Sequence, residues 1–343
     1  MNALSDVAGF GDASQPRGAP KGWDLLGGVP VPLRQRVRYG VADLLASHGE
    51  QGLKCCVPLG QGGRGPFERL RFIRALDEFP DMLVSSEHGN AFNRAFHRRH
   101  VEAGVFSGCQ PDGVDPIFSQ LVDPKGWIGV FAVAPFVLLI DRQRLGGLPI
   151  PRKWADLMEP VYCGQVVFSG WRREGNGPYS HLNLFFLLSM AREFGLEGVE
   201  KLMANVPSLL HSTQMPRLAG GGASPGGIYV VPWSLASICP RRDQTEVVWP
   251  EDGALAFPLW MTVKETQRQR LDFLIRHFHG PELADYLNHN GYPALSSECP
   301  CTLPDGASFK WLGWEFLRHS ATAGLIKAIR AVATRALEAG SCG

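Results

Sequence analysis

Two long apolar runs dominate the pattern of hydrophobic and polar positions along the chain. Gly129–Ile140 is almost continuously apolar and rich in β-branched and aromatic residues, and Ala256–Val263 has the same character nearer the C-terminus. Both runs are too short to span a bilayer, and Pro135 inside the first run disfavours a helix interior. Near-continuous apolar runs of this kind are typical of strands that are buried on both faces. We therefore predict two long buried strands, the first of them broken at Pro135.

Shorter apolar segments precede the first long run, and each ends in a polar or glycine-rich turn. Leu53–Leu59 leads into a glycine-rich loop at residues 60–65 and then into a helix, and Asp81–Ser85 leads into a polar stretch at residues 86–90. Strand segments that alternate with helical segments in this way indicate an α/β fold with a mostly parallel sheet.

The ends of these two strands hold the first candidate ligand residues. In doubly wound sheets the ligand lies outside the carboxyl ends of the parallel strands. Gly62 and Gly63 could there offer backbone N–H groups to a ligand oxygen, and Ser86, Glu87 and His88 follow the second strand. A flexible turn without a ligand is the structural alternative for the glycines, and a helix cap is the alternative for Ser86. Both alternatives stay open.

The segments that flank the long runs carry two motifs. The first is W-x-D-L…P-x-Y-x-G-x-V, formed by Trp154, Asp156, Leu157, Pro160, Tyr162, Gly164 and Val166. The second precedes the later run and consists of Pro250, Asp252, Gly253 and Pro258. In these residues the chain resembles the type II solute-binding proteins of ABC importers, especially the branch that binds iron(III) or small anions. The resemblance extends from Leu53 to Leu317.

This resemblance implies a fold and a division of the chain. It implies an α/β, periplasmic-binding-protein-like type II fold, in which two lobes are joined by two hinge strands and close on a small solute in the cleft between them. We assign residues 1–22 to a disordered leader and residues 23–51 to an N-terminal helical segment. Residues 52–134 and 259–343 are assigned to lobe 1, and residues 135–258 to lobe 2.

Lobe 2 supplies the remaining predicted ligand residues. Trp171 and Arg172 follow its first strand, and Tyr229 and Trp233 belong to or follow a later one. Arg172 would pair with an anionic group, and the aromatic rings would cover a planar or apolar face of the solute. Ferric-binding relatives commonly use an adjacent Tyr-Tyr pair, which this sequence lacks. We therefore expect an organic anion or a metal chelate as the solute rather than bare Fe³⁺, and no resident metal or cofactor.

Charge and length restrict the partners. The net charge of +1 gives no case for nucleic acid. The sequence has no apolar stretch long enough for a membrane-spanning helix, so the chain is not expected to be membrane-embedded. The resemblance implies a permease of the ABC type as the partner.

The N-terminus and the cysteines bear on location. Residues 1–22 have neither the basic nor the apolar region of a secretory signal. Eight cysteines are scattered along the chain, and the adjacent Cys55-Cys56 and the Cys299-x-Cys301 pair are poor partners for internal disulfides. We expect a cytoplasmic location with reduced thiols. The alternative is the periplasm, if a signal peptide precedes this start.

The sequence favours a binding protein over an enzyme. It contains no H-E-x-x-H, and we predict no catalytic and no metal-ligating residues. A cytoplasmic enzyme on the same fold is the alternative, because pyrimidine synthases of thiamine biosynthesis resemble binding proteins and carry a Cys-rich stretch. Cys55-Cys56 is a partial match to that stretch and could form a thiol site, although burial in a core strand is the simpler interpretation.

Overall fold

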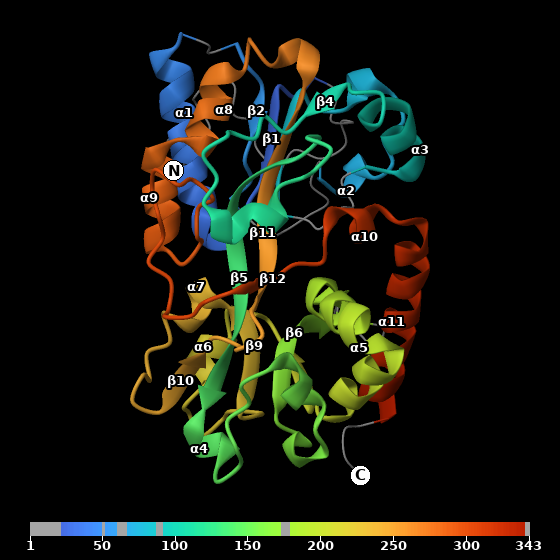
Figure 1. Ribbon diagram of the computed structural model, residues 1–343, viewed down its shortest axis with the longest axis vertical. Coiled ribbons are helices and arrows are strands. Elements are labelled where there is room, and N and C mark those ends of the chain that lie inside the picture. The colour runs from blue at the N-terminus through green and yellow to red at the C-terminus, as the bar shows by residue number, and fades with distance from the viewer. Residues whose placement is uncertain (1–21, 50–51, 60–66, 87–91, 173–178, 340–343) are drawn as a thin grey trace. The chain divides into compact units, whose positions relative to one another are not determined.

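The computed structural model describes residues 22–49, 52–59, 67–86, 92–172 and 179–339 (Figure 1). The predicted leader, residues 1–22, lies outside this range except for its last residue. The chain divides into two compact units. Unit 1 comprises residues 1–133, 258–289 and 293–301, and unit 2 comprises residues 134–257, 290–292 and 302–343.

Unit 1 contains a sheet in the strand order β2-β1-β3-β11. β1 (Leu25–Gly28) pairs in parallel with β2 (Cys55–Cys56) and with β3 (Met82–Ser85). β11 (Ala254–Lys264) runs antiparallel to β3 and also pairs with β4 (Phe106–Ser107). The sequence predicted β2 and β3 but assigned β1 to a helical segment. That assignment is wrong, because a four-residue strand is too short to show a hydrophobic period.

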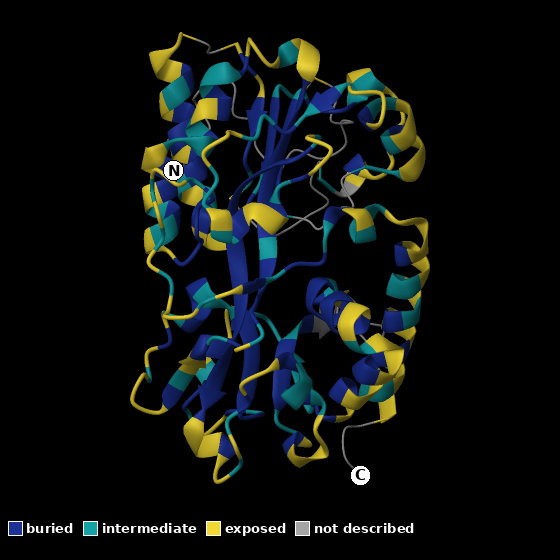
Figure 2. Ribbon diagram, in the orientation of Figure 1, coloured by how far each residue is buried: buried dark blue, intermediate teal, exposed yellow. Residues whose placement is uncertain are grey.

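Helices cover this sheet. α1 (Arg34–Ser47), α8 (Asp272–His279) and α9 (Pro281–His289) lie together on one side of unit 1 (Figure 1). α2 (Phe67–Leu70) and α3 (Arg94–Phe96) lie on the other side. The strands between them are almost wholly buried, as Figure 2 shows.

Unit 2 has its own arrangement of strands. β5 (Gly129–Asp141) is antiparallel to β9 (Ile228–Pro232), and β9 is parallel to β6 (Val166–Arg172). β6 pairs in parallel with β8 (Ser208–Leu210) and antiparallel with β7 (Tyr179–Leu182). Two further pairings extend the strands, one between β10 (Thr245–Val248) and β5 and one between β12 (Phe309–Lys310) and β11.

Two long helices pack alongside each other in unit 2, α5 (Leu184–Ala204) and α11 (Ser320–Ala339) (Figure 1). Gly195 kinks α5 at a φ of 71°, a conformation that glycine adopts without steric cost. Because α11 packs on α5, residues 302–343 group with unit 2, whereas the sequence placed them in lobe 1. The shorter helices of unit 2 are α4 (Arg142–Leu145), α6 (Met215–Leu218), α7 (Trp233–Ala236) and α10 (Trp314–Arg318).

β5 and β11 are the strands that link the units. β5 leaves unit 1 after Val133, and β11 enters it at Pro258. All 13 residues of β5 are buried. The strand is continuous through Pro135, so the predicted break is wrong. The two predicted long strands and the α/β fold of two lobes are confirmed.

The two sequence motifs contact each other in unit 2. The Trp154 indole Nε1–H donates to the Gly253 carbonyl at 2.8 Å, and the Trp154 backbone N–H donates to Asp252. Asp156 accepts from the backbone N–H groups of Arg152 and Lys153. The motif therefore forms a short 3-10 turn at Trp154–Met158.

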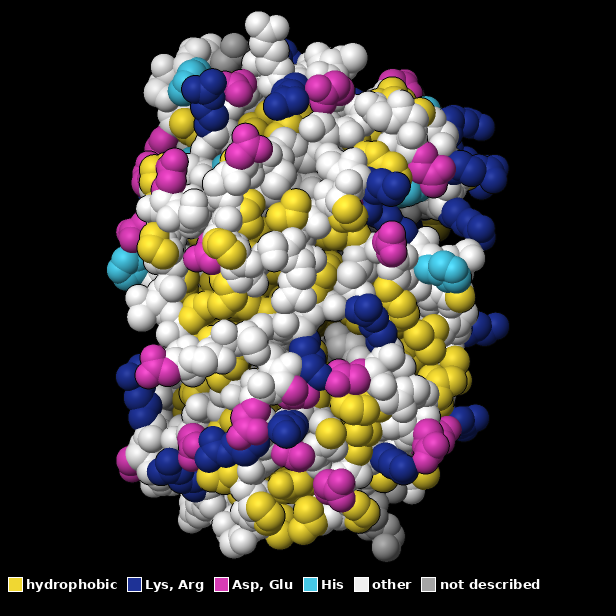
Figure 3. Space-filling view, viewed as in Figure 1, with side chains coloured by type: hydrophobic (Ala, Val, Ile, Leu, Met, Phe, Trp, Pro, Cys, Tyr) yellow, Lys and Arg dark blue, Asp and Glu magenta, His cyan; other side chains and the backbone are white. Residues whose placement is uncertain are grey.

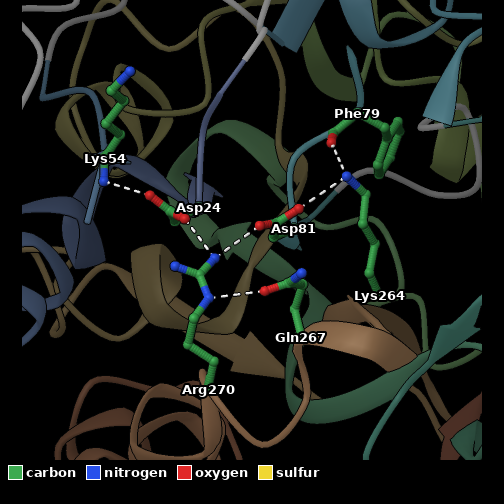
Figure 4. Close-up of polar contacts among 7 residues, drawn as sticks. All are labelled: Asp24, Lys54, Phe79, Asp81, Lys264, Gln267 and Arg270. Carbon is green, nitrogen blue, oxygen red and sulfur yellow. Dashed lines mark hydrogen bonds and ion pairs between the residues drawn. The ribbon is translucent and has the colours of Figure 1, made fainter. Parts of the chain in front are cut away.

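Charged side chains close the amino end of the unit 1 sheet, and we call Asp24, Asp81, Lys264 and Arg270 the amino-end network (Figure 4). Arg270 Nη2 donates to Asp24 at 2.6 Å and to Asp81 at 2.8 Å. Lys264 Nζ donates to Asp81 at 2.9 Å and to the Phe79 carbonyl at 2.6 Å. Asp24 and Asp81 directly precede β1 and β3, so the network joins the starts of two parallel strands to the end of β11.

Candidate functional site

The carboxyl ends of the parallel strands lie at equivalent positions in the two units. In unit 2, β6, β8 and β9 run in parallel, and the end of β9 at Pro232 pairs with Phe136, just after β5 enters the unit. In unit 1, the end of β3 at Ser85 pairs with Trp260, just after β11 enters. In each unit, therefore, the edge where an α/β sheet binds ligands is the edge where a linking strand enters.

The N-terminus of α5 presents hydrogen-bond donors near this edge of unit 2. Asn183 follows β7 and caps the helix, because its Oδ1 accepts from the Phe186 N–H at 3.2 Å and its carbonyl accepts from the Leu187 N–H at 3.1 Å. Its side chain is 7% exposed, and its Nδ2 has no hydrogen-bond partner among the described residues. A buried donor without a protein partner is expected to bind a water or a ligand oxygen.

A second unpaired donor lies beside the same helix end. The Trp311 ring is 6.4 Å from the ring of Phe185, in the first turn of α5, and its Nε1 is buried without a hydrogen-bond partner among the described residues. The ring is held in place through its backbone, because Arg192 of α5 donates to the Trp311 carbonyl at 2.8 Å. We call Asn183, Trp311 and the first turn of α5 the α5 donor site.

Aromatic rings pack around Phe185 in the first turn of α5, next to the α5 donor site. Phe185 lies 4.8 Å from Phe257 and 5.9 Å from Phe136, measured between ring centroids. Phe136 and Phe257 are in the linking strands, within a few residues of the points where these strands join unit 2. A site with N–H donors and a helix N-terminus among apolar walls suits an anionic group, because the helix dipole and the exclusion of water both strengthen its binding.

The end of β9 contributes an aromatic ring and a hydroxyl group. Trp233 is half-buried and packs edge-on against Trp249, with ring centroids 5.5 Å apart. Ser234 is 7% exposed, and its Oγ has no hydrogen-bond partner among the residues that the structure describes. The Cα of Ser234 would lie 2.9 Å from a Cβ at Gly291, so the chain at Gly291 approaches this turn more closely than a side chain allows.

Two histidines lie near the ends of β7 and β8. Burial lowers the pKa of His181, and the nearby positive charges of His211 and Arg330 lower it further. His211 directly follows β8, and its Nδ1 lies 2.8 Å from the Thr213 hydroxyl. Burial is the main cause of this lowered pKa of His181, and an anion bound nearby would oppose the shift by favouring the protonated imidazole.

The residues predicted from the sequence have different outcomes. Ser86 is half-buried after β3 and does not cap α3, since Asn93 accepts from the Phe96 N–H at 2.9 Å. Trp233 has an accessible ring. Gly62, Gly63, Glu87 and His88 lie outside the described residues. For Trp171 and Arg172 the structure describes only the backbone, which ends β6.

Tyr229 belongs to the core of unit 2 rather than to an open surface. Its exposed fraction is 0%, and its hydroxyl lies 2.5 Å from the Ser224 hydroxyl. Burial raises the pKa of Tyr229 to about 12. Tyr229 is the second residue of β9, so it lies near the start of the strand and away from the carboxyl end at Pro232. The interpretation that Tyr229 covers a ligand is therefore not supported.

The sequence interpretation missed Asn183, Ser234 and Trp311 as site residues. Neither the strand β7 nor the cap that follows it was predicted from the sequence. An asparagine directly before the apolar run Leu184–Leu188 is a helix-start signal and could have revealed this end. Nothing in the sequence brings Trp311, which is far from Asn183 along the chain, to the same helix.

Two searches over the described residues give negative results. No group of three or more His, Cys, Asp or Glu side chains among them is arranged to hold a metal ion. No helix in the described part of the chain is long and apolar enough to cross a membrane.

The comparisons with known proteins agree with this fold. The family model of the bacterial extracellular solute-binding proteins matches residues 77–320. No curated protein matches the chain. Among solved structures, the apo ferric ion-binding protein A of Pasteurella haemolytica has a TM-score of 0.63 at 14% identity, over 90% of this chain and 97% of that chain.

Two further solved structures were determined with bound molecules. The Trichodesmium protein IdiA (FutA) in complex with iron and citrate has a TM-score of 0.62 at 14% identity, over 91% of this chain and 99% of that one. AfuA from Actinobacillus pleuropneumoniae, with fructose-6-phosphate bound, has a TM-score of 0.63 at 12% identity, over 92% of this chain and 99% of its own. At these identities the likeness shows the fold alone.

Proposed function

Since this chain belongs to the bacterial extracellular solute-binding proteins, we propose that the solute it captures is a small anion rich in oxygen atoms, either an organic anion or a metal chelate. We propose further that an anionic group of this solute binds at the α5 donor site. Ser234, the Trp233 ring and the predicted residues of unit 1 would contact the rest of the solute.

The unpaired donors at the N-terminus of α5 are the observation that carries this proposal. Leaving a buried N–H group unpaired costs about 1–3 kcal/mol, so two such groups at one helix end favour an acceptor that the described residues do not supply. Both are neutral donors, and the helix end adds a positive partial charge. An anionic oxygen satisfies all three features at once, whereas a cation satisfies none of them.

The proteins of similar fold support this class of solute. Citrate with iron, and a sugar phosphate, are the molecules in the two ligand-bound relatives, and both carry several oxygen atoms and negative charge. The absence of a Tyr-Tyr pair from this sequence favours a chelate or an organic anion over bare Fe³⁺. Closure of the two lobes on the solute, which the resemblance implies, stays a prediction that small-angle scattering with and without the solute would test.

Neither the environment of the two adjacent cysteines nor the family match supports the enzyme alternative. Cys55 and Cys56 are buried in β2, and burial raises their pKa values to about 12 and about 11. A nucleophilic thiol site needs a lowered pKa, because the thiolate is the reactive form. The family match favours reversible solute binding over turnover.

We propose an extracytoplasmic location and an ABC permease as the partner. The family is described as extracellular, which supports the second of the two locations considered from the sequence. Cys163 is disulfide-bonded, in contrast to the reduced thiols expected, and disulfides are typical of oxidising compartments. Cys55, Cys56, Cys109, Cys239, Cys299 and Cys301 form no disulfide in the described part of the chain.

Native mass spectrometry of the full chain purified from its own cells would test the proposed solute. We expect a bound mass that is released on denaturation and identified as an anion with carboxylate or phosphate groups. Titration calorimetry with the identified compound then gives its affinity. A cationic or purely apolar solute would contradict the proposal, and so would conversion of the compound during incubation.

A further inference from the structure

Unit 1 carries a group of arginines that the proposed solute capture does not use. We call the following residues the arginine surface: Arg69, Arg71, Arg74, Arg94, Arg98 and Arg99. All six are exposed, and Figure 3 shows Lys and Arg side chains projecting from the part of unit 1 that carries α3. Every basic side chain here is an arginine, because the sequence has no lysine between Lys54 and Lys125.

The arginine surface is built on a rigid base. Asn93, which caps α3, also donates from Nδ2 to the Ile73 carbonyl, so the α2 segment and the start of α3 are joined. Beneath them, the ring of Phe79 lies 5.0 Å from that of Phe96 and 5.3 Å from that of Phe106. These three rings are at most 3% exposed. The arginines therefore extend from segments that are joined by a hydrogen bond and packed on buried aromatic rings.

These arginines have no carboxylate partner within the described part of the chain, although acidic residues are near in sequence. Glu102 is 3.3 Å from His97, and Asp81 belongs to the amino-end network. Asp77, in the same segment, forms no ion pair with the six arginines among the described residues. Elsewhere, exposed arginines such as Arg142, Arg268, Arg276 and Arg335 do pair with acidic side chains.

An exposed aromatic side chain accompanies the arginine surface. Phe72 is 67% exposed, and the guanidinium group of Arg71 lies 4.8 Å from its ring centroid. Guanidinium groups bind phosphate oxygens in a bidentate manner, and exposed aromatic rings are favoured at the interface between a membrane and water. Guanidinium groups beside an exposed apolar ring favour a phosphate-bearing interface, and binding to an acidic protein surface is an outcome of the test.

We propose that the arginine surface docks on the phosphate headgroups of an anionic phospholipid bilayer, with Phe72 entering the interfacial layer. This function is separate from solute capture. It places the protein at the surface of a membrane. It requires neither a bound solute nor closure of the lobes.

Co-sedimentation with vesicles tests the proposal on the full chain. Vesicles of phosphatidylglycerol and phosphatidylcholine at equal parts are compared with vesicles of phosphatidylcholine alone, at low and at physiological ionic strength. We expect binding to the anionic vesicles that weakens with salt, and no binding to the neutral vesicles. A variant with Arg71, Arg74, Arg98 and Arg99 changed to Gln should lose on the order of 1,000-fold in partitioning, from about 1 kcal/mol per arginine.

A matched control removes the same charge elsewhere. The variant with Arg142, Arg268, Arg276 and Arg335 changed to Gln should bind vesicles as the unchanged protein does. Equal losses in the two variants would overturn the proposal, because net charge alone would then explain binding. Retention by neutral vesicles would also overturn it. So would binding to soluble polyglutamate in the absence of vesicle binding, which would assign the surface to an acidic protein, or full competition by free inorganic phosphate at constant ionic strength.

Discussion

The amino-end network of unit 1 and the α5 donor site of unit 2 differ in whether their polar groups have partners within the protein. In the network, each charged side chain has a partner of opposite charge, and the backbone at Lys54 and Phe79 takes part as well. At the α5 donor site, two buried N–H groups have no partner among the described residues. Both regions lie at an end of a sheet, where strand termini leave polar groups to be satisfied.

The difference separates a region that holds the fold from one that is prepared for a solute. Paired charges at the starts of β1 and β3 join three strands and leave nothing to offer a ligand. Unpaired donors cost stability in the empty protein, and they persist where a bound molecule satisfies them. Changes in the first region should therefore reduce stability without affecting binding, and changes in the second should do the reverse.

The largest expected effect is on stability. Asp81→Ala leaves the 8% exposed Lys264 without a carboxylate, and removing one partner of a largely buried pair costs about 3 kcal/mol in the free energy of unfolding. Chemical denaturation measures this loss. The double variant Asp81→Ala/Lys264→Met should regain part of it, and solute affinity should be unchanged in both. A loss of solute affinity at constant stability would contradict the assignment of the amino-end network to the fold alone.

Asn183→Asp tests the role of the α5 donor site in solute binding. The substituted carboxylate still accepts from Phe186 and suits the helix N-terminus, so stability should be kept. It replaces the free donor by a negative charge, which should weaken binding of an anionic solute by about 2–3 kcal/mol. Titration calorimetry with the co-purified solute measures the effect, and Trp311→Phe should show a smaller loss. An affinity equal to that of the unchanged protein would remove α5 from the site.

Trp233→Ala tests whether the binding surface extends to the end of β9. If the ring is an anchor, its loss should weaken binding by about 2 kcal/mol. Ile238→Ala is the matched control, because Ile238 follows α7 and is 66% exposed. We expect no change in affinity for the control and only a small change in melting temperature for either variant. A large drop in stability for Trp233→Ala alone would assign the ring to the core.

The smallest effect at neutral pH is expected for His279→Gln. His279 lines a small cavity in unit 1 that contains no other titratable side chain among the described residues, and burial lowers its pKa from 6.5 to about 4. Below pH 6.5 the unfolded chain takes up a proton that the folded chain does not, so stability falls as the pH decreases towards about 4. The variant should lose part of this slope, while His289→Gln, at an exposed position, should retain it.

The sequence predicted those features of the fold that depend on long local patterns. The apolar runs at Gly129–Ile140 and Ala256–Val263 are strands long enough to be recognised, and the motif around Trp154 identified the link between the units. The four-residue β1 and the strand β7 gave no comparable signal, and the grouping of α11 with α5 depends on packing between distant segments.

The candidate site was less predictable for a related reason. Strand ends could be read from the sequence, and Trp233 was placed correctly at the end of β9. Tyr229, four residues earlier, was assigned to the ligand as part of the same strand of lobe 2, yet its side chain is fully buried. The unpaired state of Asn183 and Trp311 is a property of the folded structure, which no sequence pattern encodes.

Hydrogen exchange measured by mass spectrometry, with and without the co-purified solute, tests the central claim most directly. We expect the solute to slow amide exchange at the first turn of α5, around Asn183 to Leu187, and at the turn around Trp233 and Ser234. Amide exchange near Asp24 and Asp81 should stay the same. Solute-dependent protection that spares the first turn of α5, or that appears mainly around Asp24 and Asp81, would contradict it.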